Sequence, residues 1–262
     1  MCIRDRYGSL NTLSGLFTGS IEGLSADTVM VMPRYEMFGN LPYSHVNYIE
    51  KLDGVEEVMY MDVLISDSIE SMMEGVAYAV SPNFFKVYDR FETTEEAELA
   101  LWNTPNATIV GQLMADQKGL RIGDRLNTES SSLNIDGTNN WSFEVVGFYR
   151  AKQIKGDELG AIINWPAFDE ARMNEKGTLS MIMVKASSPE AGEKISKQID
   201  DQFVNSSYAT RSGPESMVAV EMAGEIADVE LIVNSILLSV FFTICLLYTS
   251  PSPRDGLLSR MP

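Results

Sequence analysis

Cysteine, histidine and long hydrophobic runs are all scarce in this chain of 262 residues. Its two cysteines, Cys2 and Cys245, lie near the two ends, and His45 is the only histidine. A single histidine excludes a metal site built from a histidine cluster. The phosphate-binding pattern GxxxxGK[ST] occurs nowhere in the sequence, so ATP hydrolysis is not expected in this chain.

Both ends of the chain have an unusual sequence. Residues 1–6 (MCIRDR) and 245–255 (CLLYTSPSPRD) resemble translations of the two strands of one transposase sequencing adapter. Foreign segments are set aside before a fold is argued, so we interpret 1–6 and 245–262 as adapter artefacts and 7–244 as natural sequence. That segment contains no cysteine, which excludes disulfides and cysteine-ligated metals and leaves the redox compartment open.

Basic residues are also few compared with acidic ones. Setting the two ends aside removes four of the 20 basic residues and two of the 37 acidic ones, which leaves 16 against 35 and a net charge of −19. A chain this acidic repels phosphate backbones, so we expect no nucleic-acid partner. The acidity indicates a soluble body but identifies no partner.

The one long apolar run is residues 231–244, which carry no charge after Glu230. A membrane-spanning helix needs about 20 apolar residues, so we interpret the run as a truncated transmembrane helix. The alternative is a buried C-terminal helix of a soluble domain. At the other end, residues 7–26 are mildly apolar and rich in small residues, and we interpret them as a juxtamembrane segment that follows a missing first transmembrane helix.

The first part of the body predicts a β-α-β-β pattern with its helices on one face. We expect strands at 28–32, 55–65 and 76–80 and a helix at 44–52. Ser44 is expected to cap that helix, and Ser81 to cap a short helix whose first residue is Pro82.

The next part has shorter elements and predicts an inserted β-rich lobe over 92–175. The expected helices are 94–102, 112–118 and 166–174, and the expected strands are 107–111, 141–149 and 160–164. Residues 120–126 are expected to form a turn that leads into a strand. The first pattern then resumes with a strand at 179–185, a helix at 189–203 and a short strand at 208–211. The prediction is an α+β, two-lobed domain. Residues 27–91 and 176–214 form a β-α-β-type lobe, and 92–175 form the inserted lobe. A linking helix at 215–230 then leads into the truncated transmembrane helix at 231–244.

Three sequence blocks resemble one known family. They are residues 80–88 (VSPNFFKVY), residues 108–112 (TIVGQ) with 119–124 (GLRIGD), and residues 143–148 (FEVVGF). In this order they resemble the signature blocks of the MacB-like periplasmic core domain of FtsX-like ABC transporter permeases. The resemblance covers about 7–244, and the apolar run after the last block is consistent with it.

The resemblance implies a permease with one transmembrane helix before this domain and three after it, in the bacterial inner membrane. It also implies a second permease copy, a cytoplasmic ABC ATPase, and a periplasmic adaptor or cargo. ATP-driven closure would pass through the helices to the outer domains, which expel or extract a substrate. A membrane-anchored sensor or binding domain without transport is the alternative, and a soluble enzyme is the third class.

The polar clusters of the sequence do not have the pattern of a catalytic site, so we predict no catalytic, cofactor-binding or metal site and no cofactor. His45 is expected to face solvent or to cap a helix. The pairs Glu56–Glu57, Glu95–Glu96 and Asp200–Asp201 are adjacent in sequence, so their carboxylates point apart. Residues 134–140 alternate oxygen ligands like a calcium loop but lack the glutamate of an EF-hand, which favours a turn.

Two further patterns have structural explanations. The methionine pairs Met30/Met32, Met59/Met61 and Met181/Met183 have the period of two that places side chains on one face of a strand. Core packing is therefore favoured over a methionine surface for apolar cargo. Gly119, Gly123 and Gly147 are interpreted as turn glycines.

Overall fold

The computed structural model describes residues 27–36, 39–64, 76–152 and 155–249. The described residues fall into two compact units, one within Gly19–Ala219, called the body here, and one that begins at Val220. The predictions for 1–6, 7–26 and 250–262 lie outside the described residues.

A single ten-stranded sheet runs through the body. Its strands follow one another in space as β12-β1-β11-β3-β4-β9-β6-β8-β5, with β7 paired to β8. Parallel pairing occurs between β4 and β9 and between β6 and β8, and the other neighbours are antiparallel. The strands are β1 (Thr28–Pro33), β3 (Val55–Leu64), β4 (Val76–Val80), β5 (Phe91–Glu92), β6 (Ala107–Gly111), β7 (Arg125–Glu129), β8 (Asn140–Ala151), β9 (Gly160–Asn164), β11 (Met181–Ala186) and β12 (Thr210–Pro214).

Strands of both predicted lobes belong to this sheet. β4 of the first lobe pairs along its whole length with β9 of the insert, from Val76 opposite Gly160 to Val80 opposite Asn164. The sheet is thus continuous between 27–91 and 92–175. The lobe boundaries themselves stay a prediction. A separate small sheet pairs β2 (Leu41–Pro42) with β10 (Thr178–Leu179).

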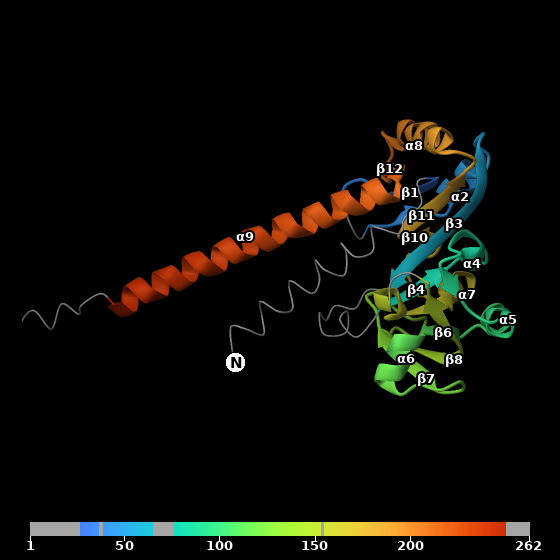
Figure 1. Cartoon of the computed structure of the whole chain (residues 1–262), viewed down its shortest axis with the longest axis horizontal. Coiled ribbons are helices and arrows are strands. Elements are labelled where there is room, and N and C mark those ends of the chain that lie inside the picture. Colours follow the sequence, from blue (N-terminus) through green and yellow to red (C-terminus); the bar gives the residue numbers. More distant parts are fainter. Residues whose placement is uncertain (1–26, 37–38, 65–75, 153–154, 250–262) are drawn as a thin grey trace, which may run out of the picture. The chain divides into compact units, whose positions relative to one another are not determined.

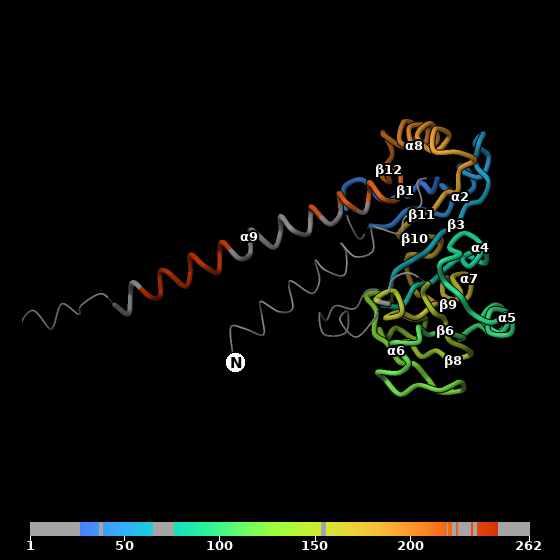
Figure 2. Tube along the Cα trace, in the orientation of Figure 1, coloured from blue at the N-terminus to red at the C-terminus, as the bar shows by residue number. Residues whose placement is uncertain are grey.

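Helices cover both faces of the sheet in the body. They are α2 (Ser44–Ile49), α4 (Phe84–Val87), α5 (Glu95–Asn103), α6 (Gln112–Lys118), α7 (Trp165–Ala171) and α8 (Pro189–Phe203), with a 3-10 turn η2 (Lys155–Glu158). Figures 1 and 2 show α8 beside β12 at one end of the body and α6 with β7 and β8 at the other.

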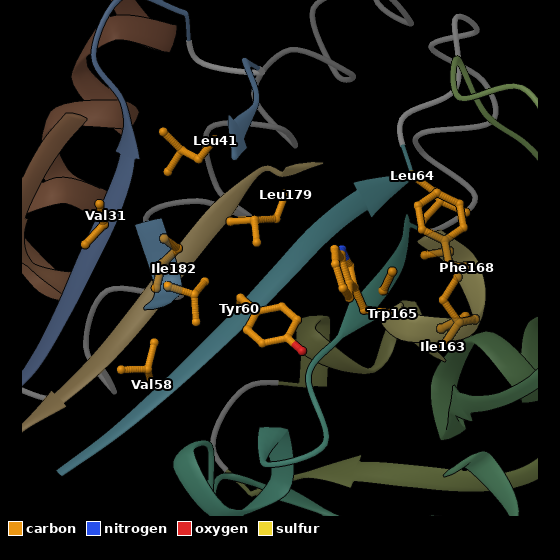
Figure 3. Close-up of a cluster of buried hydrophobic side chains, with 14 of the residues drawn as sticks. Val31, Leu41, Val58, Tyr60, Leu64, Ile163, Trp165, Phe168, Leu179 and Ile182 are labelled. Atoms are coloured by element: carbon orange, nitrogen blue, oxygen red, sulfur yellow. The ribbon is translucent and has the colours of Figure 1, made fainter. Parts of the chain in front are cut away.

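The period of two along the strands divides the core into two clusters. One face packs Val58, Tyr60 and Ile182 against residues of α2, α6, α7 and α8. Figure 3 shows part of this cluster, with Trp165 and Phe168 of α7. The other packs Met59 and Met183 against α4 and α5. The expectation that the early helices lie on one face is wrong, since α2 and α4 contribute to opposite clusters.

The opposite cluster contains the predicted methionine pairs. Met30 on β1 lies opposite Met183 on β11, which lies opposite Met59 on β3. Met181 and Met61 form the next row. Met59, Met61 and Met183 are buried, and Met30 and Met181 pack against the same cluster, so the prediction of core packing is confirmed for these five. Met32 is also buried.

The two predicted serine caps are wrong. Ser44 is the first residue inside α2, whose N-cap is Tyr43, without a side-chain bond. Ser81 is buried, and its hydroxyl accepts a hydrogen bond from the Tyr60 N–H (3.2 Å) and donates to Asn83 Oδ1 (2.6 Å). Since this serine bridges β3 and the segment after β4, the helix begins later, with Asn83 as the N-cap of α4.

The last helix, α9 (Glu215–Thr249), is a single helix that starts directly after β12. Its first five residues belong to the body and the rest to the second unit. Among the residues that the structure describes, no helix combines the length and the apolar character needed to cross a membrane.

Candidate functional site

His45 is buried, which contradicts the prediction of a solvent-facing or capping residue. Only 4% of it is exposed, and its ring stacks on Phe203 of α8 with centroids 3.7 Å apart. Burial lowers the pKa of His45 to about 4. A neutral imidazole that is buried and stacked on Phe203 is a structural element of the core.

The residues of the predicted carboxylate pairs lie mostly at the surface. Glu56, Glu95, Glu96 and Asp201 are exposed, whereas Glu57 pairs with Lys86. Within the described ranges, no group of three histidine, cysteine or acidic side chains is placed to hold a metal ion.

The loop of 134–140 closes on itself as a turn. The Asn134 N–H donates to the Thr138 carbonyl (2.8 Å), and Asp136 accepts from both the amide and the hydroxyl of Thr138. These bonds lower the pKa of Asp136. Of the predicted turn glycines, Gly119 and Gly123 have positive φ, but Gly147 lies inside β8. The turn interpretation of Gly147 is therefore wrong.

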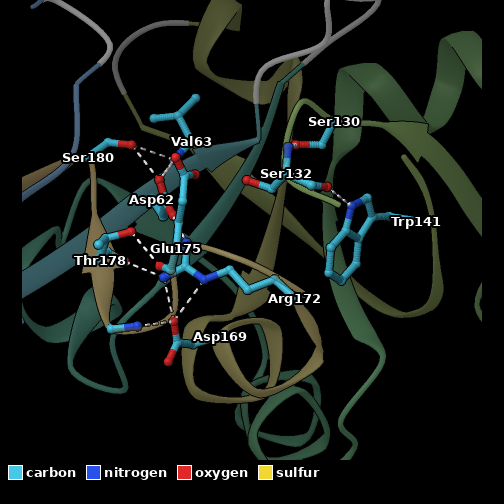
Figure 4. A network of polar contacts seen from close by, with 11 residues as sticks. Asp62, Val63, Ser130, Ser132, Trp141, Asp169, Arg172, Glu175, Thr178 and Ser180 are labelled. Carbon is cyan, nitrogen blue, oxygen red and sulfur yellow. Dashed lines mark hydrogen bonds and ion pairs between the residues drawn. The ribbon is translucent and has the colours of Figure 1, made fainter. Parts of the chain in front are cut away.

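One buried polar network joins residues of the predicted insert to residues of the predicted first lobe (Figure 4). Arg172, 1% exposed, follows α7 and donates to Asp62 Oδ2 on β3 (2.9 Å). It also donates to Asp169 (Nε to Oδ1, 2.8 Å) and to the Thr178 carbonyl (2.6 Å). The Ser180 hydroxyl donates to Asp62. Burial raises the pKa of Asp62, an effect that Ser180 and Arg172 oppose.

A second polar arrangement surrounds the start of α9. The strand before it, β12, is an edge strand that pairs only with β1 in the sheet order. Asp200 of α8 holds this strand: it accepts hydrogen bonds from the Thr210 and Ser212 hydroxyls (both 2.8 Å) and from the Ser212 N–H (3.1 Å). The carboxylate thus fixes β12 to α8.

Glu215, the first residue of α9, has a buried carboxylate. Only 2% of the residue is exposed, and its Oε1 accepts a 2.8 Å hydrogen bond from the Tyr88 hydroxyl. The Arg90 guanidinium lies 3.5 Å from the same oxygen and 4.3 Å from the centroid of the Tyr88 ring. Burial and the Glu215 charge raise the pKa of Tyr88 well above its ordinary value. A carboxylate at a helix N-terminus is also stabilised by the helix dipole.

We call the set Tyr88, Arg90, Asp200, Ser212 and Glu215 the α9 root. Its groups are held by hydrogen bonds and by the Arg90–Glu215 ion pair. The Tyr88 hydroxyl donates to the Glu215 carboxylate, but both groups are buried and the pKa of Tyr88 is raised, so the hydroxyl keeps its proton. What the arrangement can do is mechanical, because it fixes the first turn of α9 to the body. Sequence reasoning missed it: Tyr88 and Glu215 are 127 positions apart, and only the acidic residue after Pro214 indicated a helix start.

Three solved structures are similar to this chain. The periplasmic region of MacB from Actinobacillus actinomycetemcomitans has the same fold, with a TM-score of 0.53 at 12% identity over 79% of this chain and 97% of that one. The extracellular domain of the noncanonic ABC-type transporter YknZ from Gram-positive bacteria gives a TM-score of 0.46, 13% identity and coverage of 71% and 99%. A domain of a putative permease protein from Porphyromonas gingivalis gives a TM-score of 0.41 at 11% identity, over 73% of this chain and 92% of that one.

No curated protein matches the sequence. The mixed α+β fold predicted from the sequence is confirmed by the structure and by its likeness to the MacB periplasmic region. The sequence itself matches the family model of the MacB-like periplasmic core domain over residues 8–202, which contain the three blocks that carried the resemblance. This chain therefore belongs to the MacB-like periplasmic core domain family.

Proposed function

We propose that this chain is the extracytoplasmic domain of an ABC transporter permease that carries an ATP-driven conformational change from the membrane to a substrate outside the cytoplasm. The observation that carries the proposal is the family match over residues 8–202. The α9 root supports it, because a domain that receives movement through a helix needs a firm attachment of that helix to its core. A domain held only by a loose linker would not transmit displacement.

The apolar run of 231–244 is proposed as the beginning of a transmembrane helix in the bacterial inner membrane. Where the structure describes its side chains, large apolar ones are exposed, among them Ile236, Leu238 and Phe242. Exposed apolar side chains in such number require an apolar environment or a partner, and a helix that is apolar all round is typical of a membrane span.

The energy source in this proposal is a cytoplasmic ABC ATPase, on a separate chain or fused to the permease. The phosphate-binding motif is lacking in this sequence, so the hydrolysis step is assigned elsewhere and this domain is non-catalytic. The resemblance also implies a second permease copy. The candidate cargoes are lipoproteins, lipids, peptides and antibiotics, and mechanical signalling without any cargo is the alternative. A periplasmic adaptor is a further partner to test.

The first test is to recover the source DNA on both sides of residues 7–244. We expect one apolar span upstream and three downstream, with basic residues on the cytoplasmic flanks, and a neighbouring ATPase gene. The assembled permease and ATPase should then co-purify from membranes. A reading frame that ends directly after Ile244 would contradict the proposal and favour an anchored sensor or binding domain.

A further inference from the structure

The hydrogen bond between Tyr88 and Glu215 connects chain segments that border opposite ends of the sheet. β12 stands first in the spatial order of strands and β5 stands last. Glu215 follows β12 directly in the chain, and Tyr88 comes shortly before β5. Eight strand-to-strand steps therefore separate the two edge strands along the sheet, whereas 2.8 Å separates Tyr88 Oη from Glu215 Oε1.

The surroundings of this bond hold it in one place. Tyr88 and Phe91 both pack on Phe84, with ring centroids 5.6 and 5.5 Å away, and Phe91 also contacts Tyr149 at 5.4 Å. The Arg90 guanidinium lies over the Tyr88 and Phe91 rings, 4.3 and 5.4 Å from their centroids. A carboxylate buried in apolar surroundings is stable only while it keeps its charged and hydrogen-bonding partners. Glu215 therefore cannot shift away from Tyr88 and Arg90 without a large penalty.

The two carboxylates of the α9 root hold different parts of the body. Asp200 holds β12 to α8, which lies on the face that carries α2, α6 and α7. Glu215 reaches the segment between α4 and β5, whose Phe84 and Tyr88 belong to the cluster on the opposite face. The start of α9 is thus attached to both faces and to both ends of the strand order.

We propose that Tyr88 and Arg90 are positioning residues that make the first turn of α9 and the α4–β5 segment move as one unit. A displacement that enters through α9 then reaches β12 through the chain and β5 through Glu215. The inference rests on the proposed function for its biological role. Its structural content, a coupling between two distant edges of one sheet, is a property of the chain itself.

Hydrogen exchange on the 262-residue chain tests the coupling through amides remote from each substitution. In the α4–β5 segment, the Tyr88 N–H donates to the Phe84 carbonyl and the Phe91 N–H to the Tyr88 carbonyl. Glu215→Gln keeps an acceptor for the Tyr88 hydroxyl but removes the charge that is paired with Arg90. We expect it to lower protection of these two amides about tenfold, because a hydrogen bond to a charged acceptor is stronger than one to a neutral acceptor. Because coupling is reciprocal, Tyr88→Phe should lower protection of the β12 amides by a similar factor.

A matched control exists in the same aromatic cluster. The Tyr149 hydroxyl is also buried and donates to the Asp157 carbonyl at 2.7 Å, so Tyr149→Phe removes an equivalent group that does not reach α9. We expect Tyr149→Phe to lower the exchange protection of amides in η2 and to leave the protection of the β12 amides unchanged. The double variant of Tyr88 and Glu215 should lose no more protection than the stronger single variant. The inference would be overturned if each substitution lowered amide protection only in its own segment. It would also be overturned if the loss of protection in the double variant equalled the sum of the two single losses.

The complete permease with its ATPase supplies the functional readout. We expect Tyr88→Phe to lower the amount of substrate moved per ATP hydrolysed while the ATPase rate and membrane insertion stay unchanged, and Tyr149→Phe to lower neither. If the wild type and Tyr88→Phe moved the same amount of substrate per ATP hydrolysed, the positioning role would be overturned. If no ATPase partner exists, the proposed function fails, and the exchange experiment still decides whether the two edges are coupled.

Discussion

Arg172 and Asp62 form an ion pair in the interior of the body, with 2.9 Å between Nη1 and Oδ2 and 110 positions between them in the chain. Neither side chain is more than 7% exposed. The pair joins the C-terminal end of α7 to the C-terminal part of the long strand β3. It thus connects the two predicted lobes, which the sheet also connects through β4 and β9.

Arg172→Met is expected to destabilise the body by about 3–5 kcal/mol, because it leaves the Asp62 and Asp169 carboxylates without their cation. Chemical denaturation followed by circular dichroism measures the change. Adding Asp62→Asn to that variant should recover part of the loss, since the unpaired buried charge is then gone. A single variant as stable as the wild type would show that the ion pair contributes no net stability.

Gly147 is expected to tolerate no side chain. A Cβ at this position of β8 would lie 2.3 Å from the Ala97 Cβ of α5, and such an overlap in a packed core typically costs about 1–3 kcal/mol. Gly147→Ala should therefore lower the thermal unfolding midpoint. Ala97→Gly removes the opposing methyl at a cost of about 1 kcal/mol in the helix, so the double variant should be more stable than Gly147→Ala alone.

Local signals in the sequence predicted several elements at their observed bounds. The helix expected at 189–203 is α8 (Pro189–Phe203), because Ser188 caps it and Pro189 occupies its first turn. The helix expected at 112–118 ends where predicted, since Gly119 adopts the left-handed conformation at φ 67°. Both outcomes depend on residues within one turn of the helix end.

Features set by distant residues could not be predicted. The Ser81 hydroxyl bonds to β3 instead of capping a helix, and His45 is buried because Phe203 of α8 covers it. Arg172 gave no sign of its partner on β3. β2 and β5 have two residues each, too few for a periodic pattern. Pairings and burial of this kind arise from the tertiary fold, which composition and spacing do not specify.

Two substitutions of Met59 distinguish a packing role of its side chain from a specific role of its sulfur. The residue is fully buried between Met183 and the cluster on the α4–α5 face. Met59→Leu conserves volume and should cost less than about 1.5 kcal/mol, whereas Met59→Ala leaves a cavity and should cost about 2–5 kcal/mol. Urea denaturation of both variants measures these values. Equal and large losses would indicate that the thioether itself is required.

His45 is expected to make the stability of the body depend on pH. Burial lowers its pKa from 6.5 to about 4 in the folded chain, so between these values the unfolded chain binds more protons than the folded one. Stability from this group is therefore fully present above pH 6.5, falls as the pH drops toward 4, and then levels off.

Denaturation curves at pH 7, 5.5 and 4.5 measure the effect of His45, with His45→Gln as the matched variant that cannot titrate. Each unit of pKa shift corresponds to about 1.4 kcal/mol of differential stability, so the difference between the two proteins is measurable. We expect the wild type to lose more stability than His45→Gln over this range. Parallel curves would show that protonation of His45 does not oppose folding and that its stacking on Phe203 accommodates the charged ring.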